Sequence, residues 1–309
     1  MRRNLLPLLS LLLCTGLRGA QPGGALIVER MPIDLPAFEA TPPIARYATA
    51  SEYAEAKADP NFLYERLLYR SNGVVVSGYL YGPKQLSGKL PAIVFSRGSL
   101  IVHNQAPLLV TMMRRLARQG FVVFAPMFRG SDGTAGHDEL GGADLADLRN
   151  AIEVVNSLPS VNAGEVFLYG ESRGGMMTYF ALRDGFPVRA AAVYGATTDL
   201  EETLNLQDPD RKLARFLWPD YDAEREGIHE SRSALRWPEK IRTPILILHG
   251  GDDSLSPRQS LRLAEALTVH RRPYSLVIFA HDDHVLTRNR HKRDQLAVEW
   301  FQQHRLAPK

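Results

Sequence analysis

A six-residue turn constrains this chain more than any other segment of it. Gly170-Glu171-Ser172-Arg173-Gly174-Gly175 follows the apolar run 166–169 and precedes a helix-compatible stretch, 176–183. A Gly-x-Ser-x-Gly turn this sharp leaves no room for side chains at its outer glycines and strains the serine at its apex. The pattern predicts Ser172 above a sheet edge, at a helix N-terminus whose N–H groups face the same spot. A glycine-rich turn with an incidental serine is the alternative, which the rest of the chain has to exclude.

The first twenty residues have the pattern of a secretory signal peptide. Arg2 and Arg3 precede an apolar run from Leu5 to Leu13, and small residues follow up to Ala20. The run is too short for a comfortable membrane span, so we expect a secreted or periplasmic mature chain without a spanning segment. An uncleaved N-terminal membrane anchor stays open as the alternative.

Removal of residues 1–20 would also remove the net charge and the single cysteine. The segment holds three of the 37 basic residues and none of the 34 acidic ones, so the two become equal in number. This balance implies no nucleic-acid partner. Cys14 would leave with the signal, so we expect no disulfide, thiol nucleophile or cysteine-based zinc site.

Strands and helices alternate along most of the remaining chain. We expect residues 21–60 to form an extended lead-in with a short helix near 51–57, and residues 61–309 to form one domain. Strands are expected at 63–69, 73–80, 91–95, 121–125, 165–169, 190–194, 245–249 and 275–279, with an Asn72-Gly73 hairpin turn. Helices are expected at 106–119, 143–158, 176–183, 257–269 and 288–304. This order predicts an α/β fold with a mostly parallel central sheet and helices on both faces.

Residues 199–243 interrupt the alternation after the sixth expected strand. They carry Trp218, Tyr221 and Trp237 among many charged residues. We interpret the stretch as a small helical insertion over the carboxyl edge of the sheet, where ligands bind in such folds. The sequence does not decide between a lid over a site and a plain connecting helix pair.

A nucleophilic serine needs a base, and the base needs an orienting acid. In the α/β-hydrolase fold the acid and then the histidine follow the serine in the chain. Asp252 and Asp253 follow the strand expected at 245–249, and His281 and His284 follow the strand expected at 275–279. These positions predict an α/β-hydrolase with a Ser-Asp-His triad. A metal pair of the two histidines is the alternative, but no third ligand cluster accompanies them, so we expect no metal and no cofactor.

The chain resembles the catalytic domain of the prolyl oligopeptidase family of serine hydrolases over about residues 64–305. The resemblance rests on the elbow sequence, on Phe128-Arg129-Gly130-Ser131, on segment 240–250, and on Asp253 followed by Pro257, Gln259 and Ser260. It implies Asp253 as the acid, because the family has His-Gly-x-x-Asp with proline four residues later. It implies His284 as the base, because the family's histidine ends an acidic run. Val285 stands where the family usually has glycine.

An oxyanion hole needs two backbone N–H groups. One is expected from Arg173, the residue after the nucleophile. The other is expected from the loop 96–99, where Gly98 and Ser99 are the candidates. Relatives often carry His-Gly-Gly at this point, whereas this chain reads Ser-Arg-Gly-Ser.

The resemblance implies a serine peptidase that acts on small peptides through an acyl-enzyme. Family members usually carry a substrate-filtering β-propeller before the hydrolase domain. Only about 40 residues lie between the expected signal and the domain, so we expect no propeller. A carboxylesterase of the same fold, with an ester substrate, is therefore the alternative. A catalytically inactive binding protein is the contrasting class, which an intact triad disfavours. The oligomeric state stays open.

Overall fold

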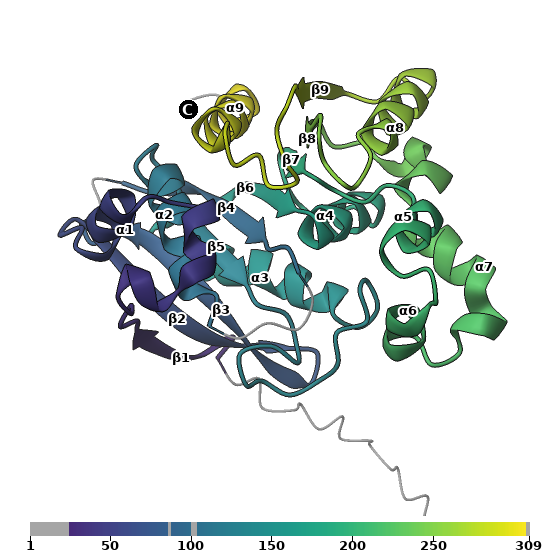
Figure 1. Ribbon diagram of the computed structural model, residues 1–309. Helices are drawn as coiled ribbons and strands as arrows, with labels where there is room; N and C mark the ends of the chain where they lie inside the picture. Colours follow the sequence, from purple (N-terminus) through teal and green to yellow (C-terminus); the bar gives the residue numbers. More distant parts are fainter. Residues whose placement is uncertain (1–24, 86–87, 100–103, 307–309) are drawn as a thin grey trace, which may run out of the picture.

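A single nine-stranded sheet organises the computed structural model, which describes residues 25–85, 88–99 and 104–306. The strand order is β1-β2-β3-β5-β4-β6-β7-β8-β9 (Figure 1). The β1–β2, β2–β3 and β3–β5 pairs are antiparallel, and every other pair is parallel. The strands are β1 (Ile27–Pro32), β2 (Phe62–Ser71), β3 (Val74–Pro83), β4 (Leu90–Ser96), β5 (Val122–Pro126), β6 (Val161–Glu171), β7 (Ala191–Tyr194), β8 (Ile245–Gly250) and β9 (Tyr274–Phe279).

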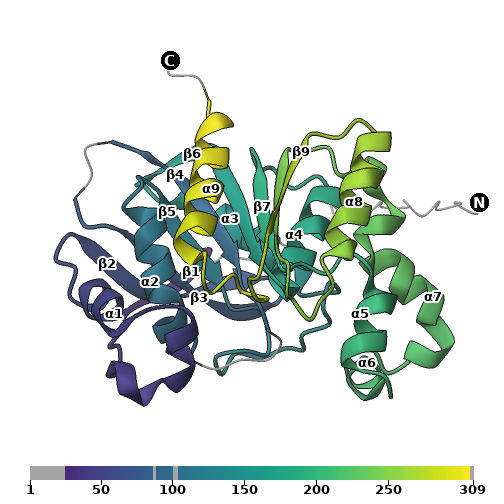
Figure 2. The same cartoon turned by 45° about the horizontal axis from the view of Figure 1, so that its top comes forward.

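Helices cover both faces of this sheet, as the sequence predicts. α1, α2 and α9 lie on one face, and α3, α4 and α8 lie on the other (Figures 1 and 2). Their bounds are α1 (Ala50–Lys57), α2 (Ala106–Ala117), α3 (Leu145–Ser157), α4 (Arg173–Arg183), α8 (Arg258–Val269) and α9 (Arg290–Gln303). The parallel strands therefore all point their carboxyl ends to one edge of a sheet that is covered on both sides.

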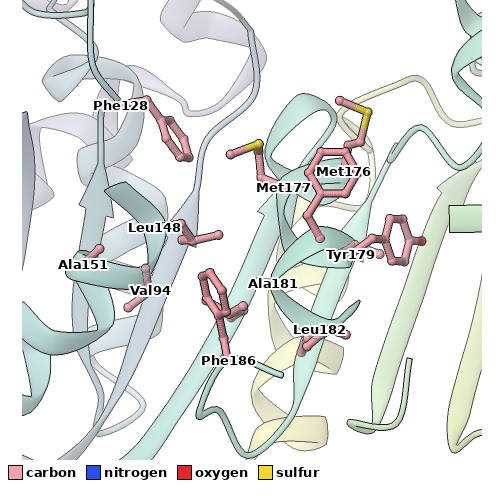
Figure 3. Packing of buried hydrophobic residues seen from close by; sticks show 14 of the residues in the cluster. Val94, Phe128, Leu148, Ala151, Met176, Met177, Tyr179, Ala181, Leu182 and Phe186 are labelled. Atoms are coloured by element: carbon pink, nitrogen blue, oxygen red, sulfur yellow. The ribbon is translucent and has the colours of Figure 1, made fainter. Parts of the chain in front are cut away.

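Two apolar clusters, one on each face, hold the layers together. Figure 3 shows the α4 side of the larger cluster, where Met177 and Leu182 of α4 pack with Leu148 of α3 and Val94 of β4. These side chains are at most 2% exposed. Burial on this scale fixes α4, and with it the turn that precedes α4, against the sheet.

Local signals in the sequence explain several element boundaries. Asn72 and Gly73 both have positive φ, 43° and 88°, as a two-residue hairpin turn between β2 and β3 requires. Thr49 and Glu52 form a reciprocal capping box at the start of α1, where a short helix was expected.

β1 is an additional strand within the expected extended lead-in. It pairs with β2 at the edge of the sheet, and its side chains are mostly exposed, so no run of buried apolar residues marks it in the sequence. Two short 3-10 helices follow, η1 (Phe38–Ala40) and η2 (Pro42–Arg46). Because of β1, the insertion follows the seventh strand of the sheet, β7, and not the sixth.

The insertion is helical, as expected. Both views place it on the side of the molecule opposite α1 (Figures 1 and 2). It consists of α5 (Leu200–Gln207), α6 (Lys212–Leu217), α7 (Tyr221–Arg232), η3 (Ala234–Arg236) and η4 (Pro238–Lys240).

The expected signal peptide, residues 1–20, lies outside the described residues. Within the described ranges, no helix has the length and apolar character needed to cross a membrane.

Candidate active site

Ser172 lies at the junction of β6 and α4, at the carboxyl edge of the sheet. Its backbone has φ 51° and ψ −117°, a strained conformation for a residue with a side chain. Its N–H donates to the carbonyl of Tyr194 on the neighbouring strand β7, at 2.9 Å. The sheet thus holds the turn in place, and the strain is compensated by packing around it.

Close backbone contact explains the glycines of the turn. A Cβ at Gly170 would lie 2.6 Å from the carbonyl oxygen of Gly174. A Cβ at Gly174 would collide with the carbonyl oxygens of Ser96 and Arg97, at the end of β4. These neighbours are backbone atoms that cannot rotate away, so only glycine fits.

The structure brings Ser172, His284 and Asp253 into one hydrogen-bonded chain. Ser172 Oγ lies 2.8 Å from His284 Nε2, and His284 Nδ1 lies 2.8 Å and 3.0 Å from the two carboxylate oxygens of Asp253. With the proton on Nδ1 donated to Asp253, Nε2 is left to accept the serine proton. The Asp253 side chain is fully buried, and that of His284 is 27% exposed.

Charges and hydrogen bonds around Ser172, His284 and Asp253 favour an ionised Asp253 carboxylate and a more basic His284 imidazole. Burial raises the pKa of the Asp253 carboxyl, but hydrogen bonds from His249 and His284 outweigh burial and hold that pKa at about 2. Burial lowers the pKa of His284, but the hydrogen bond that His284 donates to Asp253 and the charges of Asp253 and Glu171 outweigh burial, so that pKa is raised.

The loop that carries His284 is built by the two aspartates before it. The buried Asp282 carboxylate accepts from the N–H groups of Asp283, Arg288 and Asn289. Asp283 accepts from the N–H and the hydroxyl of Thr287. The acidic run therefore shapes the loop.

His281 and Asp252, the other two candidates, lie outside the triad. The His281 side chain is 82% exposed and lies 3.6 Å from the exposed Asp252 carboxylate. Across the part of the chain that the structure describes, no three His, Cys, Asp or Glu side chains converge as metal ligands.

His249 is a site residue that the sequence marks only as the histidine of the His-Gly-x-x-Asp motif. It is fully buried, and its Nε2 lies 3.0 Å from Asp253 Oδ2 and 2.8 Å from the carbonyl of Leu255. Both neighbours are acceptors, so Nε2 carries the proton, and Nδ1 accepts from the Ser260 hydroxyl at 2.7 Å. His249 thus orients the acid from behind. Its place directly before Gly250 in His-Gly-x-x-Asp was the available signal.

Glu171 and the lead-in place further charges beside the imidazole. Glu171 is 9% exposed and accepts from the Tyr194 hydroxyl at 2.5 Å. The Glu171 charge and burial together raise the pKa of Tyr47, the C-cap residue of η2. Arg46 lies 3.5 Å from the Asp283 carboxylate. No local sequence signal connects residues 46–47 with residues 171 and 283, because only the folded chain brings them together.

Arg97 holds the loop that was expected to supply the second oxyanion donor. Arg97 is 1% exposed, and its guanidinium donates to the carbonyls of Gly98 and Ser99, each at 2.9 Å, and to the carbonyl of Met127. Gly98 is buried, whereas Ser99 is exposed and has a positive φ of 61°. The conformation of both candidates therefore depends on a buried cation.

Arg173 makes a buried ion pair on the other side of the elbow. Its Nη2 donates to Asp138 Oδ1 at 2.7 Å and to Asp144 Oδ2 at 2.9 Å. The Asp144 side chain makes no capping hydrogen bond to α3. Asp144 is at the N-cap position, but its carboxylate accepts from the N–H groups of Gly141 and Gly142 and from Arg173. The nearby arginine charge draws the carboxylate away from the helix end.

Sequence comparison assigns the chain to one family, and solved structures agree with it in fold. The model of the prolyl oligopeptidase family matches residues 109–306, which include Ser172, Asp253 and His284 and exclude Gly98 and Ser99. The chain belongs to the prolyl oligopeptidase family. The expected serine peptidase family is thereby confirmed, and with it the α/β-hydrolase fold and the enzyme class.

Individual members of the prolyl oligopeptidase family are distant relatives. The chain is 27% identical over 209 residues to the uncharacterized peptidase YtmA of Bacillus subtilis (strain 168), covering 67% of this chain and 80% of that protein. The Pyrococcus horikoshii acylaminoacyl peptidase structure superimposes with a TM-score of 0.70 and 20% identity, covering 85% of this chain and 44% of that one. The structure of a puromycin-hydrolyzing peptidase from Mycobacterium tuberculosis superimposes with a TM-score of 0.67 and 22% identity. The match covers 78% of this chain and 39% of that one. The chain thus spans less than half of either solved structure.

Proposed function

We propose that this protein is a serine peptidase that cleaves small peptides by two-step acyl transfer. The hydrogen-bonded chain from Ser172 Oγ through His284 to Asp253 carries the proposal. His284 accepts the serine proton as Oγ attacks the carbonyl, and then donates it to the leaving amine. Asp253 stabilises the imidazolium, and a water molecule then repeats the attack on the acyl-enzyme.

The oxyanion in this proposal is bound by the N–H groups of Arg173 and Ser99. Arg173 opens α4, where a backbone N–H has no partner within the helix. The Arg97 carbonyl oxygen faces Gly174, so the N–H of Gly98, on the opposite side of the same trans peptide, points away from α4. The Gly98 carbonyl faces the Arg97 side chain, which leaves the N–H of Ser99 directed away from that side chain. These directions favour Ser99 over Gly98.

Peptide amides are the proposed substrates because of the family and its named relatives, which include an acylaminoacyl peptidase and a puromycin-hydrolyzing peptidase. A carboxylesterase is the second candidate, since the same triad attacks esters. Glu201 and Glu202 do not favour a site for a substrate amine, because they are paired with Arg225 and Arg262.

Parallel assays with p-nitrophenyl acetate and with aminoacyl- and X-Pro-anilides test this proposal. We expect turnover of at least one anilide, lost in Ser172→Ala. Ester turnover without anilide turnover would favour the carboxylesterase. Turnover of neither class by the folded protein would contradict both.

We also propose that the protein is secreted or periplasmic, on the basis of the pattern in residues 1–20. N-terminal sequencing of the protein recovered from its native source tests this. A start near residue 21 is expected, and an intact Met1 in a cytoplasmic fraction would contradict it.

A further inference from the structure

Two side chains of the insertion donate hydrogen bonds to the loop 138–144, which also contacts Arg173 of the elbow. Trp218, which follows α6, donates its Nε1–H to the carbonyl of Glu139 at 2.8 Å. Arg232, which ends α7, donates to the carbonyls of Leu140 at 3.0 Å and Glu139 at 3.3 Å. The Arg232 guanidinium also lies over the Trp218 ring, 4.9 Å from its centre. Two successive backbone carbonyls are therefore held from the insertion.

The loop 138–144 contains a residue with an unfavourable backbone conformation, which these hydrogen bonds help to hold. Leu140 has φ 54°, in the left-handed region that residues with a side chain disfavour. The Leu140 N–H donates to Asp138 Oδ1, and the next two N–H groups donate to Asp144. Two carbonyls of this segment, of Glu139 and Leu140, thus face the insertion, and the N–H groups of residues 140–142 face the two aspartates.

The same two aspartates hold the side chain of Arg173. Besides the ion pairs at 2.7 Å and 2.9 Å, the Arg173 guanidinium lies 3.9 Å from the centre of the Phe128 ring. The side chain is 5% exposed. Because the side chain and the proposed oxyanion N–H belong to the same residue, fixing the guanidinium restricts the position of that N–H.

The second proposed donor, Ser99, is linked to the neighbouring residues 127–128 through the Arg97 side chain. Phe128 has φ 63°, and the Arg97 guanidinium also lies over its ring, 5.5 Å from the ring centre. Arg97 in turn holds the carbonyls of Gly98 and Ser99. Residues 127–144 thus contact the side chains that position both oxyanion donors.

We infer that Trp218 and Arg232 are positioning residues for the oxyanion hole, acting through the 138–144 loop and Arg173. This inference rests on the proposed acyl transfer. The insertion is then neither a free lid nor a passive connector. Its contact with the loop stabilises the transition state, where the oxyanion forms, more than it stabilises bound substrate.

Trp218→Phe tests this inference, with Trp237→Phe as a matched control. The Trp237 indole donates to the carbonyl of Glu230, so both ends of its hydrogen bond lie inside the insertion. We expect Trp218→Phe to lower kcat for a p-nitrophenyl ester about tenfold, with KM nearly unchanged, since small misplacements of catalytic groups are costly. The rate of labelling by a fluorophosphonate should fall in parallel. Trp237→Phe should leave kcat, KM and labelling at wild-type values.

Arg232→Gln tests the same inference with the same assays if Trp218→Phe does not fold. Its control is Arg225→Gln, because Arg225 on the same helix pairs with Glu201 within the insertion. A loss of kcat in Arg232→Gln alone supports the inference. Equal rates in all variants, an effect on KM alone, or equal losses in variant and control would overturn it. A folded wild type that takes no label would instead overturn the proposed function itself.

Discussion

The charge on His284 is set by residues from distant segments of the chain. Burial lowers its pKa, but the Asp253 hydrogen bond and the charges of Asp253 and Glu171 outweigh burial, while the Arg46 charge acts in the opposite direction. The net pKa lies above the usual value of about 6.5 for histidine. Because a general base must be neutral, kcat/KM should rise with pH through this raised pKa.

The rise of kcat/KM with pH forms the acidic limb of the pH profile. Two single-charge variants should shift this limb in opposite directions along the pH axis. Glu171→Gln removes a negative charge that favours the imidazolium, so the limb should shift to lower pH. Arg46→Gln removes a positive charge that disfavours it, so the limb should shift to higher pH. Profiles of kcat/KM from about pH 5 to 9 at low ionic strength measure both shifts. Shifts in the same direction would contradict this account of the site.

The sequence indicated Ser172, Asp253 and His284 as candidates because each follows a strand with an apolar run, and the structure brings these three side chains together. The sequence was not sufficient for His249 and Arg97. Arg97 is stabilised by partners distant in the chain, such as the Met127 carbonyl, which no local pattern reveals. The partners of His249 lie close in the chain, and only the His-Gly-x-x-Asp motif marks it.

At the scale of elements, the strand–turn–helix unit depends on contact between backbones. The turn lies so close to the end of β4 that a methyl group at Gly174 would overlap carbonyl oxygens. In contrast, a Cβ at Gly227, in the middle of α7, would have nothing within 4 Å.

Gly174→Ala should therefore destabilise the protein by about 3 kcal/mol, because overpacking against backbone cannot relax. The matched control Gly227→Ala should be neutral or stabilise by up to about 1 kcal/mol, because alanine is the better helix former. Unfolding in guanidinium chloride measures both. A Gly174→Ala protein as stable as wild type would show that the turn is looser than the structure indicates.

The regular elements were predictable where burial leaves a pattern in the sequence. β7 reads as an apolar run because all four of its residues are buried. β1 pairs only at the edge and leaves no such pattern. The function of the insertion was not predictable either, because its contacts to Glu139 and Leu140 use backbone carbonyls, which every residue type has.

At the scale of the whole molecule, buried or half-buried carboxylates join distant segments. Asp59 pairs with Arg114, Asp294 with Arg115, and Glu165 with Arg305, at 2.7 to 3.1 Å. Burial raises the pKa of each carboxyl, but the arginine partners outweigh burial and hold all three pKa values below normal. Such groups add stability above the unfolded pKa, and that stability is lost as pH falls through the folded value.

The protein should accordingly lose stability in acid. Because the unfolded carboxyls bind protons near about pH 4, the guanidinium midpoint should hold near neutral pH and fall steadily below about pH 4. Asp59→Asn should lower the midpoint at neutral pH and flatten part of its decline in acid. A midpoint that does not change between neutral pH and about pH 3 would contradict the role given to these pairs.

Labelling with a fluorophosphonate, mapped by peptide mass spectrometry, tests most directly whether Ser172 is an activated nucleophile. It reports an activated serine without requiring the correct substrate. We predict one adduct, on Ser172, absent from Ser172→Ala and formed at least about a hundredfold more slowly in His284→Gln. A folded wild-type protein that takes no label, or takes it on another serine, would contradict the account.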